Sequence, residues 1–299
     1  MKLLTFFAER GLTLGVKTDR GVLDVAASVE RYSGTAAVPQ TIRLFLEGGE
    51  EAFQALAAHV RRMESAGEVQ LFLDEESLRF GPCVPEPGKI ICVGLNYRKH
   101  AEESNMAVPE YPVLFNKYSN ALAAHNDEIT LPAEAQQVDY EAELAIVIGR
   151  RAKRVKREEA LSYVAGYCNA NDLSARDLQM RTSQWLLGKS CDGFSPLGPY
   201  LVTSDEVGNP NNLEITSFVN GDVRQHSNTS DMIFACDEIV HYISRYMTLE
   251  PGDVILTGTP EGVILGYPKE RQVWLKDGDV VTIEIEKLGR LTNRMRREA

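Results

Sequence analysis

The sequence lacks the features that mark membrane and secreted proteins. Its apolar runs are shorter than the roughly 18 residues of a membrane span, and residues 1–20 lack the basic, apolar and small-residue segments of a signal peptide. The five cysteines stand singly, without a Cys-x-x-Cys pair. We therefore expect free thiols, a reducing compartment and a cytosolic protein.

Clustered positive charge is also scarce. The formal net charge is −11, whereas nucleic-acid binding depends on clustered Lys and Arg. The one basic run, residues 150–157, lies between a predicted strand and a predicted helix, and we interpret it as a solvated loop. Neither a Walker loop nor a Gly-x-Gly-x-x-Gly fingerprint is present. We expect no nucleic-acid partner and no membrane partner.

What is present is typical of a globular chain with two units. A hydrophobic share of 43% in 299 residues allows a substantial core. The first 80 residues predict a small α/β domain of strands followed by helices, at 3–7, 12–17, 21–24, 41–46 and 52–63. Prolines and a glycine at 82–88 then mark a boundary. We predict a small N-terminal domain at 1–80 and a metal-binding catalytic domain at 87–299.

The second unit is rich in strands. Asn220-Gly221, a dipeptide typical of a type I′ turn, predicts a hairpin of strands 213–219 and 222–225. Further strands are predicted at 89–93, 254–256, 280–286 and 290–295. Helices are predicted at 158–164 and 234–246, the latter capped by Ser230-Asp231. The mixture predicts an α+β domain with a mixed, mostly antiparallel sheet.

Two glutamates interrupt a strongly apolar segment at 139–149. Strand side chains alternate between faces, so Glu141 and Glu143 share one face while apolar residues occupy the other. Two like charges in a poorly hydrated place require a proton or a cation. Asp172 ends the next apolar run and adds a third carboxylate. Three oxygen donors at neighbouring strand ends favour a divalent cation, Mg²⁺ first, over an ion pair with Arg176.

A histidine and a glutamate three residues apart follow the strand predicted at 89–93. On one helical turn, Glu103 would orient the imidazole of His100 as a general base. The alternative is an ion pair at the surface. The next segment, 106–112, is polar and contains a proline, so we interpret it as a mobile lid that would bring the pair to the metal, with an ordinary surface loop as the alternative.

Two glycine-containing segments offer groups for an anionic ligand. Lys189, in the loop at 188–199, could contact an anionic or carbonyl oxygen near the cation, and the alternative is a solvated lysine. Thr259 follows the strand at 254–256 and offers its hydroxyl, with nearby backbone N–H groups, to a carboxylate. A plain tight turn is the alternative there.

Taken together, these motifs resemble the fumarylacetoacetate hydrolase family. Each motif is modest alone, but their order over residues 87 to 299 is specific. The first 80 residues match only as the small N-terminal domain that many members carry. The matching segments are Val93-Gly-Leu-Asn-Tyr-x-x-His100-x-x-Glu103, Phe115-Asn-Lys117, Asp139-Tyr-Glu-x-Glu-Leu144, Asn171-Asp-Leu-Ser-Ala-Arg-Asp177, Gly188-Lys-Ser-x-Asp192, Gly198-Pro199, Asn220-Gly221, Ser230-Asp-Met-Ile-Phe234, Thr257-Gly-Thr-Pro260 and Gly262-Val263.

The resemblance implies a mixed β-sandwich roll as catalytic domain, a homodimer and a small-molecule oxo-acid substrate. It also implies Mg²⁺ or Mn²⁺ on the three carboxylates Glu141, Glu143 and Asp172, and a catalytic pair at His100 and Glu103 on a lid. In relatives, substrate-contacting or site-supporting positions match Lys189, Arg176, Gln179 and Thr259.

The first functional prediction is hydrolysis of a carbon–carbon bond in a 2,4-diketo acid, such as an acylpyruvate or a diketo-deoxy sugar acid. The cation would stabilise the enolate, His100 would activate water, and Lys189 would hold the developing oxyanion. Decarboxylation of oxaloacetate, or isomerisation or tautomerisation of a 2-oxo acid, uses the same site without water. A non-catalytic sugar-acid or metal-binding protein is the alternative from another class.

Overall fold

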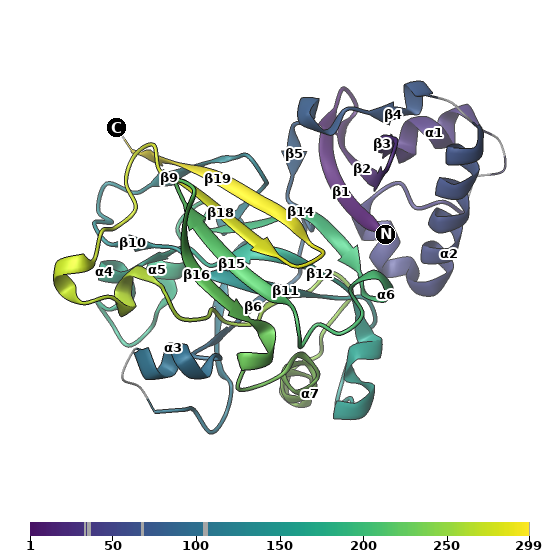
Figure 1. Ribbon diagram of the computed structural model, residues 1–299. Helices are drawn as coiled ribbons and strands as arrows, with labels where there is room; N and C mark the ends of the chain where they lie inside the picture. Colours follow the sequence, from purple (N-terminus) through teal and green to yellow (C-terminus); the bar gives the residue numbers. More distant parts are fainter. Residues whose placement is uncertain (33, 35–36, 67–68, 104–106, 299) are drawn as a thin grey trace.

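A large mixed sheet organises the computed structural model, which describes residues 1–32, 34, 37–66, 69–103 and 107–298 (Figure 1). Its strands are β1 (Lys2–Ala8), β2 (Gly11–Thr18), β3 (Gly21–Asp24), β4 (Phe72–Leu73), β5 (Phe80–Gly81), β6 (Ile90–Gly94), β7 (Val113–Lys117), β8 (Leu122–Ala123), β11 (Ala142–Ile148), β12 (Val164–Asn171), β14 (Ser195–Thr203) and β17 (Val254–Leu256). The order is β4-β3-β2-β1-β14-β12-β11-β17-β6-β7, with β5 on β1 and β8 on β14.

A second, smaller sheet packs against the first. Its strands are β9 (Glu128–Leu131), β15 (Glu214–Val219), β16 (Asp222–Asn228), β18 (Val280–Ile285) and β19 (Gly289–Arg297). They follow the order β16-β15-β18-β19-β9, and the short strands β10 (Val138–Asp139) and β13 (Ser174–Ala175) form a separate pair. Ile146 of β11 and Ile215 of β15 belong to one buried apolar cluster, so the two sheets share a core. The predicted α+β fold with a mixed β-sandwich roll is confirmed.

Helices are few and short apart from α2 and α7. The α-helices are α1 (Val25–Arg31), α2 (Ile42–Ala66), α3 (Arg98–Glu103), α4 (Arg176–Gln179), α5 (Leu186–Lys189), α6 (Ser204–Val207) and α7 (Cys236–Tyr246). The 3-10 segments are η1 (Val69–Leu71), η2 (Glu75–Ser77), η3 (Ser119–Ala121), η4 (Arg157–Tyr163), η5 (Thr229–Asp231), η6 (Ile264–Gly266) and η7 (Lys269–Arg271). In Figure 1, α1 and α2 lie on the outer side of the N-terminal strands.

The N-terminal residues form the predicted strands and helices. Gly49 has φ 54°, which breaks α2 into the two predicted helices. Helix α1 was not predicted; the Asp24 side chain caps it by accepting a hydrogen bond from the Ala27 N–H at 2.9 Å. β1 pairs with β14 through Leu3 and Leu201, so the sheet is continuous across the expected boundary. The division into domains 1–80 and 87–299 stays a prediction.

Two predicted elements of the second unit differ from the structure. The segment at 158–164 forms the 3-10 segment η4 rather than an α-helix. The predicted cap at Ser230-Asp231 is wrong, because these residues belong to η5 and α7 begins only at Cys236. The intervening chain is tied to the segment after β6: the Ile233 N–H donates to the Asn96 carbonyl at 2.8 Å. The predicted hairpin at Asn220-Gly221 is confirmed.

Strand β11 is buried on both faces. Leu144, Ile146 and Ile148 face the cluster shared with the smaller sheet, whereas Ala145 and Val147 belong to a second cluster with the N-terminal residues. This two-sided burial explains the continuous apolar run. A charged side chain on β11, such as Glu143, is therefore largely screened from bulk water.

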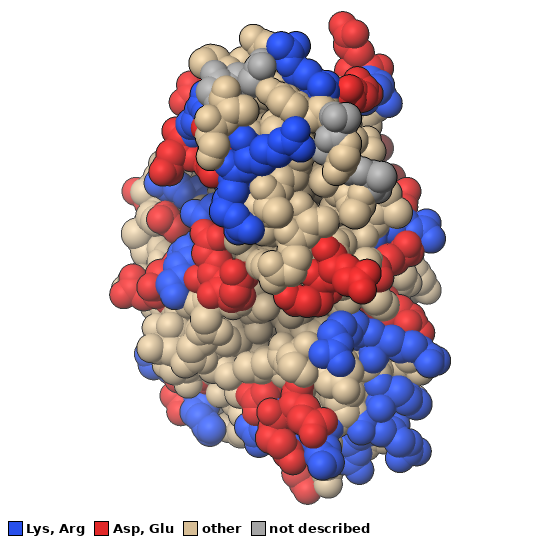
Figure 2. Space-filling model, turned by 90° about the vertical axis from the view of Figure 1, so that its right-hand side faces the viewer, with Lys and Arg blue, Asp and Glu red and all other residues tan. Residues whose placement is uncertain are grey.

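The outer surface carries charges of both signs. Figure 2 shows acidic and basic groups as neighbours over one face, with other residues between them. Carboxylates pair with the basic run 150–157: Arg157 contacts Asp237 at 2.6 Å and Arg151 contacts Glu250 at 3.1 Å. All five cysteines are free thiols, as predicted. Within the described part of the chain, no helix has the length and apolar character needed to cross a membrane.

Candidate metal and substrate site

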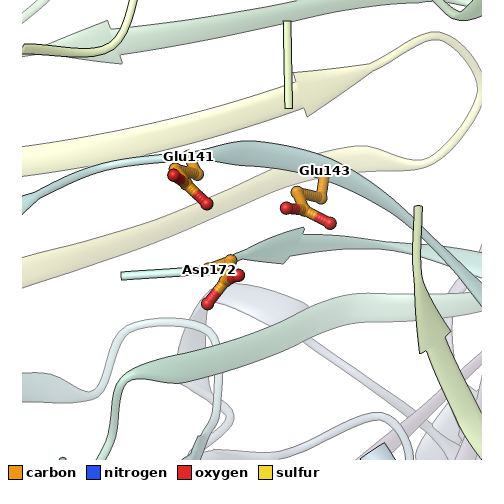
Figure 3. Close-up of side chains that lie close together, drawn as sticks. All are labelled: Glu141, Glu143 and Asp172. Carbon is orange, nitrogen blue, oxygen red and sulfur yellow. The ribbon is translucent and has the colours of Figure 1, made fainter. Parts of the chain in front are cut away.

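The three predicted carboxylates meet where β11 and β12 lie side by side. Ala142 of β11 pairs with Asn171 of β12, and the Asp172 N–H donates to the Glu141 carbonyl at 3.0 Å. All three carboxylates are buried, and each contributes an oxygen within 4.8 Å of the others. Figure 3 shows the side chains of Glu141 and Glu143 directed toward the same region as Asp172. The acidic cluster can hold a metal ion.

A buried lysine bridges two of these carboxylates. Lys189 Nζ lies 2.7 Å from Glu141 Oε2 and 2.8 Å from Asp172 Oδ2. Burial lowers the pKa of Lys189, but the carboxylates of Asp172 and Glu141 outweigh it, and the net pKa is raised. The alternative of a solvated lysine is wrong, because Lys189 is 2% exposed.

A second buried lysine, Lys117, belongs to the site, and the sequence pattern did not predict this role. Lys117 Nζ pairs with Asp172 and donates to the carbonyls of Phe194 at 2.7 Å and Leu173 at 3.2 Å. Its three acceptors satisfy the ammonium group fully. The only signal for it in the sequence is the motif Phe115-Asn-Lys117 at the end of a short strand.

Arg176 is held by carboxylates on two sides. Its guanidinium lies 2.7 Å from Glu141 and 2.9 Å from Asp139, and it also donates to Gln179 Oε1 at 3.1 Å. Asp139 accepts a backbone N–H from Ile264 at 2.8 Å, which ties the loop after β17 to the site. Arg176 therefore forms an ion pair with Glu141 of the acidic cluster and with Asp139, but not with Asp172 as the alternative had it.

Glu143 is the one carboxylate of the acidic cluster that forms no ion pair with these cations. It has no ion-pair partner among the described residues and accepts one backbone hydrogen bond, from Gly258 at 2.7 Å. Burial, followed by the charges of Asp172 and Glu141, raises its pKa well above the ordinary value. For Glu141, burial acts in the same direction, but Lys189 and Arg176 lower the pKa to about 2.

The charge balance fits a divalent cation. Four buried carboxylates face three buried cations, which leaves one negative charge in excess. The oxygen donors suit a hard ion such as Mg²⁺ or Mn²⁺. The carboxylates are Asp139, Glu141, Glu143 and Asp172, and the cations are Lys117, Arg176 and Lys189. With a divalent ion and all four carboxylates ionised, the site carries one excess positive charge, which suits an anionic ligand.

The predicted histidine–glutamate pair lies on α3 at the mouth of the same site. His100 Nδ1 is 3.6 Å from Glu103 Oε2, and Glu103 accepts from the Gly262 N–H at 3.1 Å. His100 is only 7% exposed, so the alternative of a surface ion pair is wrong. Its Nδ1 has no hydrogen-bond partner among the described residues. Glu103 is therefore near enough to orient the ring once a ligand tightens the contact.

The predicted lid is described only in part. Residues 104–106, including Met106 of the lid segment, lie outside the described residues. Beyond them, the exposed ring of Tyr111 stacks on Tyr242 with the ring centroids 6.5 Å apart. The prediction that this segment closes over a ligand stays a prediction.

A cavity of about 380 Å³ connects these groups. Apolar side chains form part of its wall, among them Phe115, Trp185 and Leu265. Asp172 is not part of the lining, although its carboxylate lies 2.8 Å from the ammonium group of Lys189, which is. Eight of the nine predicted site residues line the cavity: His100, Glu103, Glu141, Glu143, Arg176, Gln179, Lys189 and Thr259.

The chain is similar to enzymes with several activities. It is 44% identical over 302 residues to a bovine (Bos taurus) mitochondrial oxaloacetate tautomerase, with 99% of this chain and 91% of the relative covered. A crystal structure of a 5-carboxymethyl-2-hydroxymuconate delta-isomerase from Mycobacterium smegmatis has a TM-score of 0.75 and 34% identity, with both chains fully covered. A maleylpyruvate hydrolase from Sphingobium sp. SYK-6, solved with manganese(II) and pyruvate, has a TM-score of 0.79 and 28% identity, again with full coverage.

The family assignment rests on the second unit. Residues 89–296 match the family profile described as Fumarylacetoacetate (FAA) hydrolase C-terminal. This range includes the acidic cluster and every residue predicted for the site. The predicted resemblance is confirmed: the chain belongs to the fumarylacetoacetate hydrolase family, as a metal-dependent enzyme of the hydrolase, decarboxylase or isomerase kind.

Proposed function

We propose that the protein is a divalent-cation-dependent tautomerase of a 2-oxo dicarboxylic acid, with oxaloacetate as the first substrate to test. The observation that supports this proposal most directly is the acidic cluster, in which Glu143 has no ion-pair partner among the described residues. The cluster opens on the same cavity as the buried His100. The 44% identity to an oxaloacetate tautomerase supports this choice over hydrolysis. Carbon–carbon hydrolysis, the first prediction from the sequence, becomes the second candidate.

The cation site is assigned to the three carboxylates. Glu141, Glu143 and Asp172 would hold Mg²⁺ or Mn²⁺, and the proton that burial favours on Glu143 must leave first. When bound, the cation supplies positive charge that stabilises the enolate oxygen of a 2-oxo acid. Lys117 and Lys189 fix the orientation of Asp172 from two sides.

The remaining cavity residues bind the substrate and move its proton. Gln179 Oε1 accepts a hydrogen bond from Arg176, so the amide N–H groups of Gln179 stay available for a substrate carboxylate. The hydroxyl of Thr259 is available as well. His100 takes the proton from the carbon next to the keto group and delivers it to the oxygen of the resulting enolate, which gives the enol, and the reverse sequence gives the ketone, while Glu103 orients the imidazole. The apolar wall limits the access of water, which favours proton transfer within the substrate over hydrolysis.

Enol absorbance in the ultraviolet tests this proposal. With Mg²⁺, the protein should accelerate conversion of enol-oxaloacetate to the keto form, and His100→Ala should lose this activity. An equally active His100→Ala variant, or no acceleration by the wild type, would show that the proposal is wrong. His226→Ala is the matched control, because His226 is exposed on β16.

The second candidate has its own support. The similar maleylpyruvate hydrolase structure contains pyruvate and manganese(II), and pyruvate is the product expected when an acylpyruvate is cleaved. Incubation with acylpyruvates and with oxaloacetate separates the reactions, because cleavage forms a second acid, decarboxylation forms CO₂ and tautomerisation forms neither.

The assembly and the location belong to the proposal as well. We keep the homodimer as predicted from the resemblance, and the cytosolic location as predicted from the scattered cysteines. The bovine relative is named mitochondrial. Fractionation of the native cells and light scattering of the purified protein test these two predictions.

A further inference from the structure

A buried glutamine from the smaller sheet reaches into the wall of the site. Gln225 lies on β16 and is 1% exposed. Its Oε1 accepts from the Ala142 N–H at 3.0 Å, and Ala142 lies between the two glutamates of the acidic cluster. Its Nε2 donates to Thr259 Oγ1 at 2.8 Å and to the Pro260 carbonyl at 2.9 Å. Both amide hydrogens are used, so the orientation of the amide is fixed.

This arrangement decides how Thr259 can hydrogen-bond. A threonine hydroxyl has one hydrogen to donate and can accept through its lone pairs. Thr259 Oγ1 already accepts from Gln225 and donates no hydrogen bond within the described residues. Because Thr259 lines the cavity, its hydrogen is left for a ligand. A hydroxyl without this acceptor role would be free to rotate and donate to the protein instead.

The loop that carries Thr259 lies directly against β16. Gly262 has φ 95°, and a Cβ atom there would lie 2.4 Å from the carbonyl oxygen of Arg224. Only glycine allows this approach. The Gly262 N–H also donates to Glu103. Strand β16 therefore supports the loop from behind at two neighbouring residues, Arg224 and Gln225.

We propose that Gln225 is a positioning residue that presents the Thr259 hydroxyl as a hydrogen-bond donor to a carboxylate of the substrate, at a fixed place relative to the cation-binding strand. The inference rests on the proposed 2-oxo acid function and names a residue that acts on it through Thr259. Gln225 itself does not line the cavity. Its effect is therefore expected on substrate binding, with little change in the chemical step.

The test compares binding of oxalate, a dianionic probe for the 2-oxo acid site, in the presence of Mn²⁺. A hydrogen bond to a charged group contributes enough that losing it should weaken oxalate binding roughly 10- to 100-fold in Gln225→Met. Thr259→Val should weaken binding by a similar factor. If the two residues act as one unit, the double variant should be no weaker than the weaker single variant. KM for oxaloacetate should rise while kcat changes little.

Calorimetric titration of Mn²⁺ alone separates positioning from general damage. The Mn²⁺ affinity of Gln225→Met should stay near that of the wild type, and Thr259→Ser, which keeps the hydroxyl, should bind oxalate nearly normally. If Gln225→Met does not fold, oxalate binding is measured with Gln225→Glu instead. The glutamate keeps an acceptor for the Ala142 N–H but accepts the hydrogen of the Thr259 hydroxyl, so oxalate binding should again be weaker than in the wild type.

Unchanged oxalate binding in the folded variant, or losses that add in the double variant, would overturn the role of Gln225. Failure of the wild type to bind oxalate with Mn²⁺ would overturn the proposed function as well.

Discussion

Replacing Glu143 by glutamine probes the one carboxylate of the cluster that lacks a cation. Glutamine has nearly the shape of the protonated acid, so the metal-free protein should tolerate it. At a cation concentration of about 100 times Kd, binding stabilises the folded wild type by about 2.7 kcal/mol. If loss of this ligand weakens binding about 100-fold, the upper end of the loss seen when a residue that only hydrogen-bonds to a metal ligand is removed, about 0.4 kcal/mol of stabilisation remains at that concentration.

The pH dependence of the metal-free proteins provides a second readout. Burial, Asp172 and Glu141 raise the pKa of Glu143 in the folded state, so the group favours folding below its ordinary value of 4.5. That stability is lost as pH rises toward the folded-state pKa. Between the two values, the wild type should lose stability relative to Glu143→Gln by about 1.4 kcal/mol per pH unit.

Urea unfolding in chelator at several pH values, and thermal unfolding with added Mg²⁺, measure both effects. The Mg²⁺-induced shift in Tm should fall by roughly 4 °C in the variant. Glu128→Gln is the control, because Glu128 is exposed on β9. Parallel pH curves for wild type and Glu143→Gln, together with an unchanged Mg²⁺ shift, would show that Glu143 neither takes up a proton in the metal-free site nor binds the cation.

Three further predictions concern the neighbours of Glu143. Lys189→Met leaves Glu141 and Asp172 short of one cation and should lower the free energy of unfolding in chelator by about 3–5 kcal/mol; added Mg²⁺ should restore part of this, and full stability in urea would contradict it. The pKa of Glu141 is lowered to about 2, so its stabilisation is present above about pH 4.5 and is lost as pH falls toward 2. Glu141→Gln should therefore flatten the acid limb of the stability curve, and an unchanged limb would count against the ion pairs. His100→Ala should lose turnover while its Mn²⁺ affinity, measured by calorimetry, stays near the wild-type value; a large loss of affinity would mean that His100 supports the metal site instead.

The acidic cluster was predictable because it depends on local pattern. Alternation along one strand places Glu141 and Glu143 on the same face, and the end of the next apolar run supplies Asp172. The helix at 98–103 and the Asn220-Gly221 hairpin likewise depend on neighbours in sequence. In all these cases, the interacting residues lie on one segment or on consecutive strands.

Two residues that support the cluster from distant segments were not predicted. Lys117 reaches Asp172 across 55 positions, and Gln225 reaches Ala142 across 83. A single lysine or glutamine on a short strand has no periodic signal, and only the fold brings its partner near. The pairing of β1 with β14 and the late start of α7 were missed for the same reason, since both depend on contacts between distant segments.

Calorimetric titration of chelator-treated protein, first with Mn²⁺ and then with oxalate, shows whether the three carboxylates hold a cation that in turn binds the substrate analogue. We predict one cation per chain, with proton release from the cluster on binding, and oxalate binding only after the cation is present. Asp172→Asn should lose both events. Oxalate binding of equal affinity without the cation, or wild-type Mn²⁺ binding by Asp172→Asn, would contradict a cation on these three carboxylates.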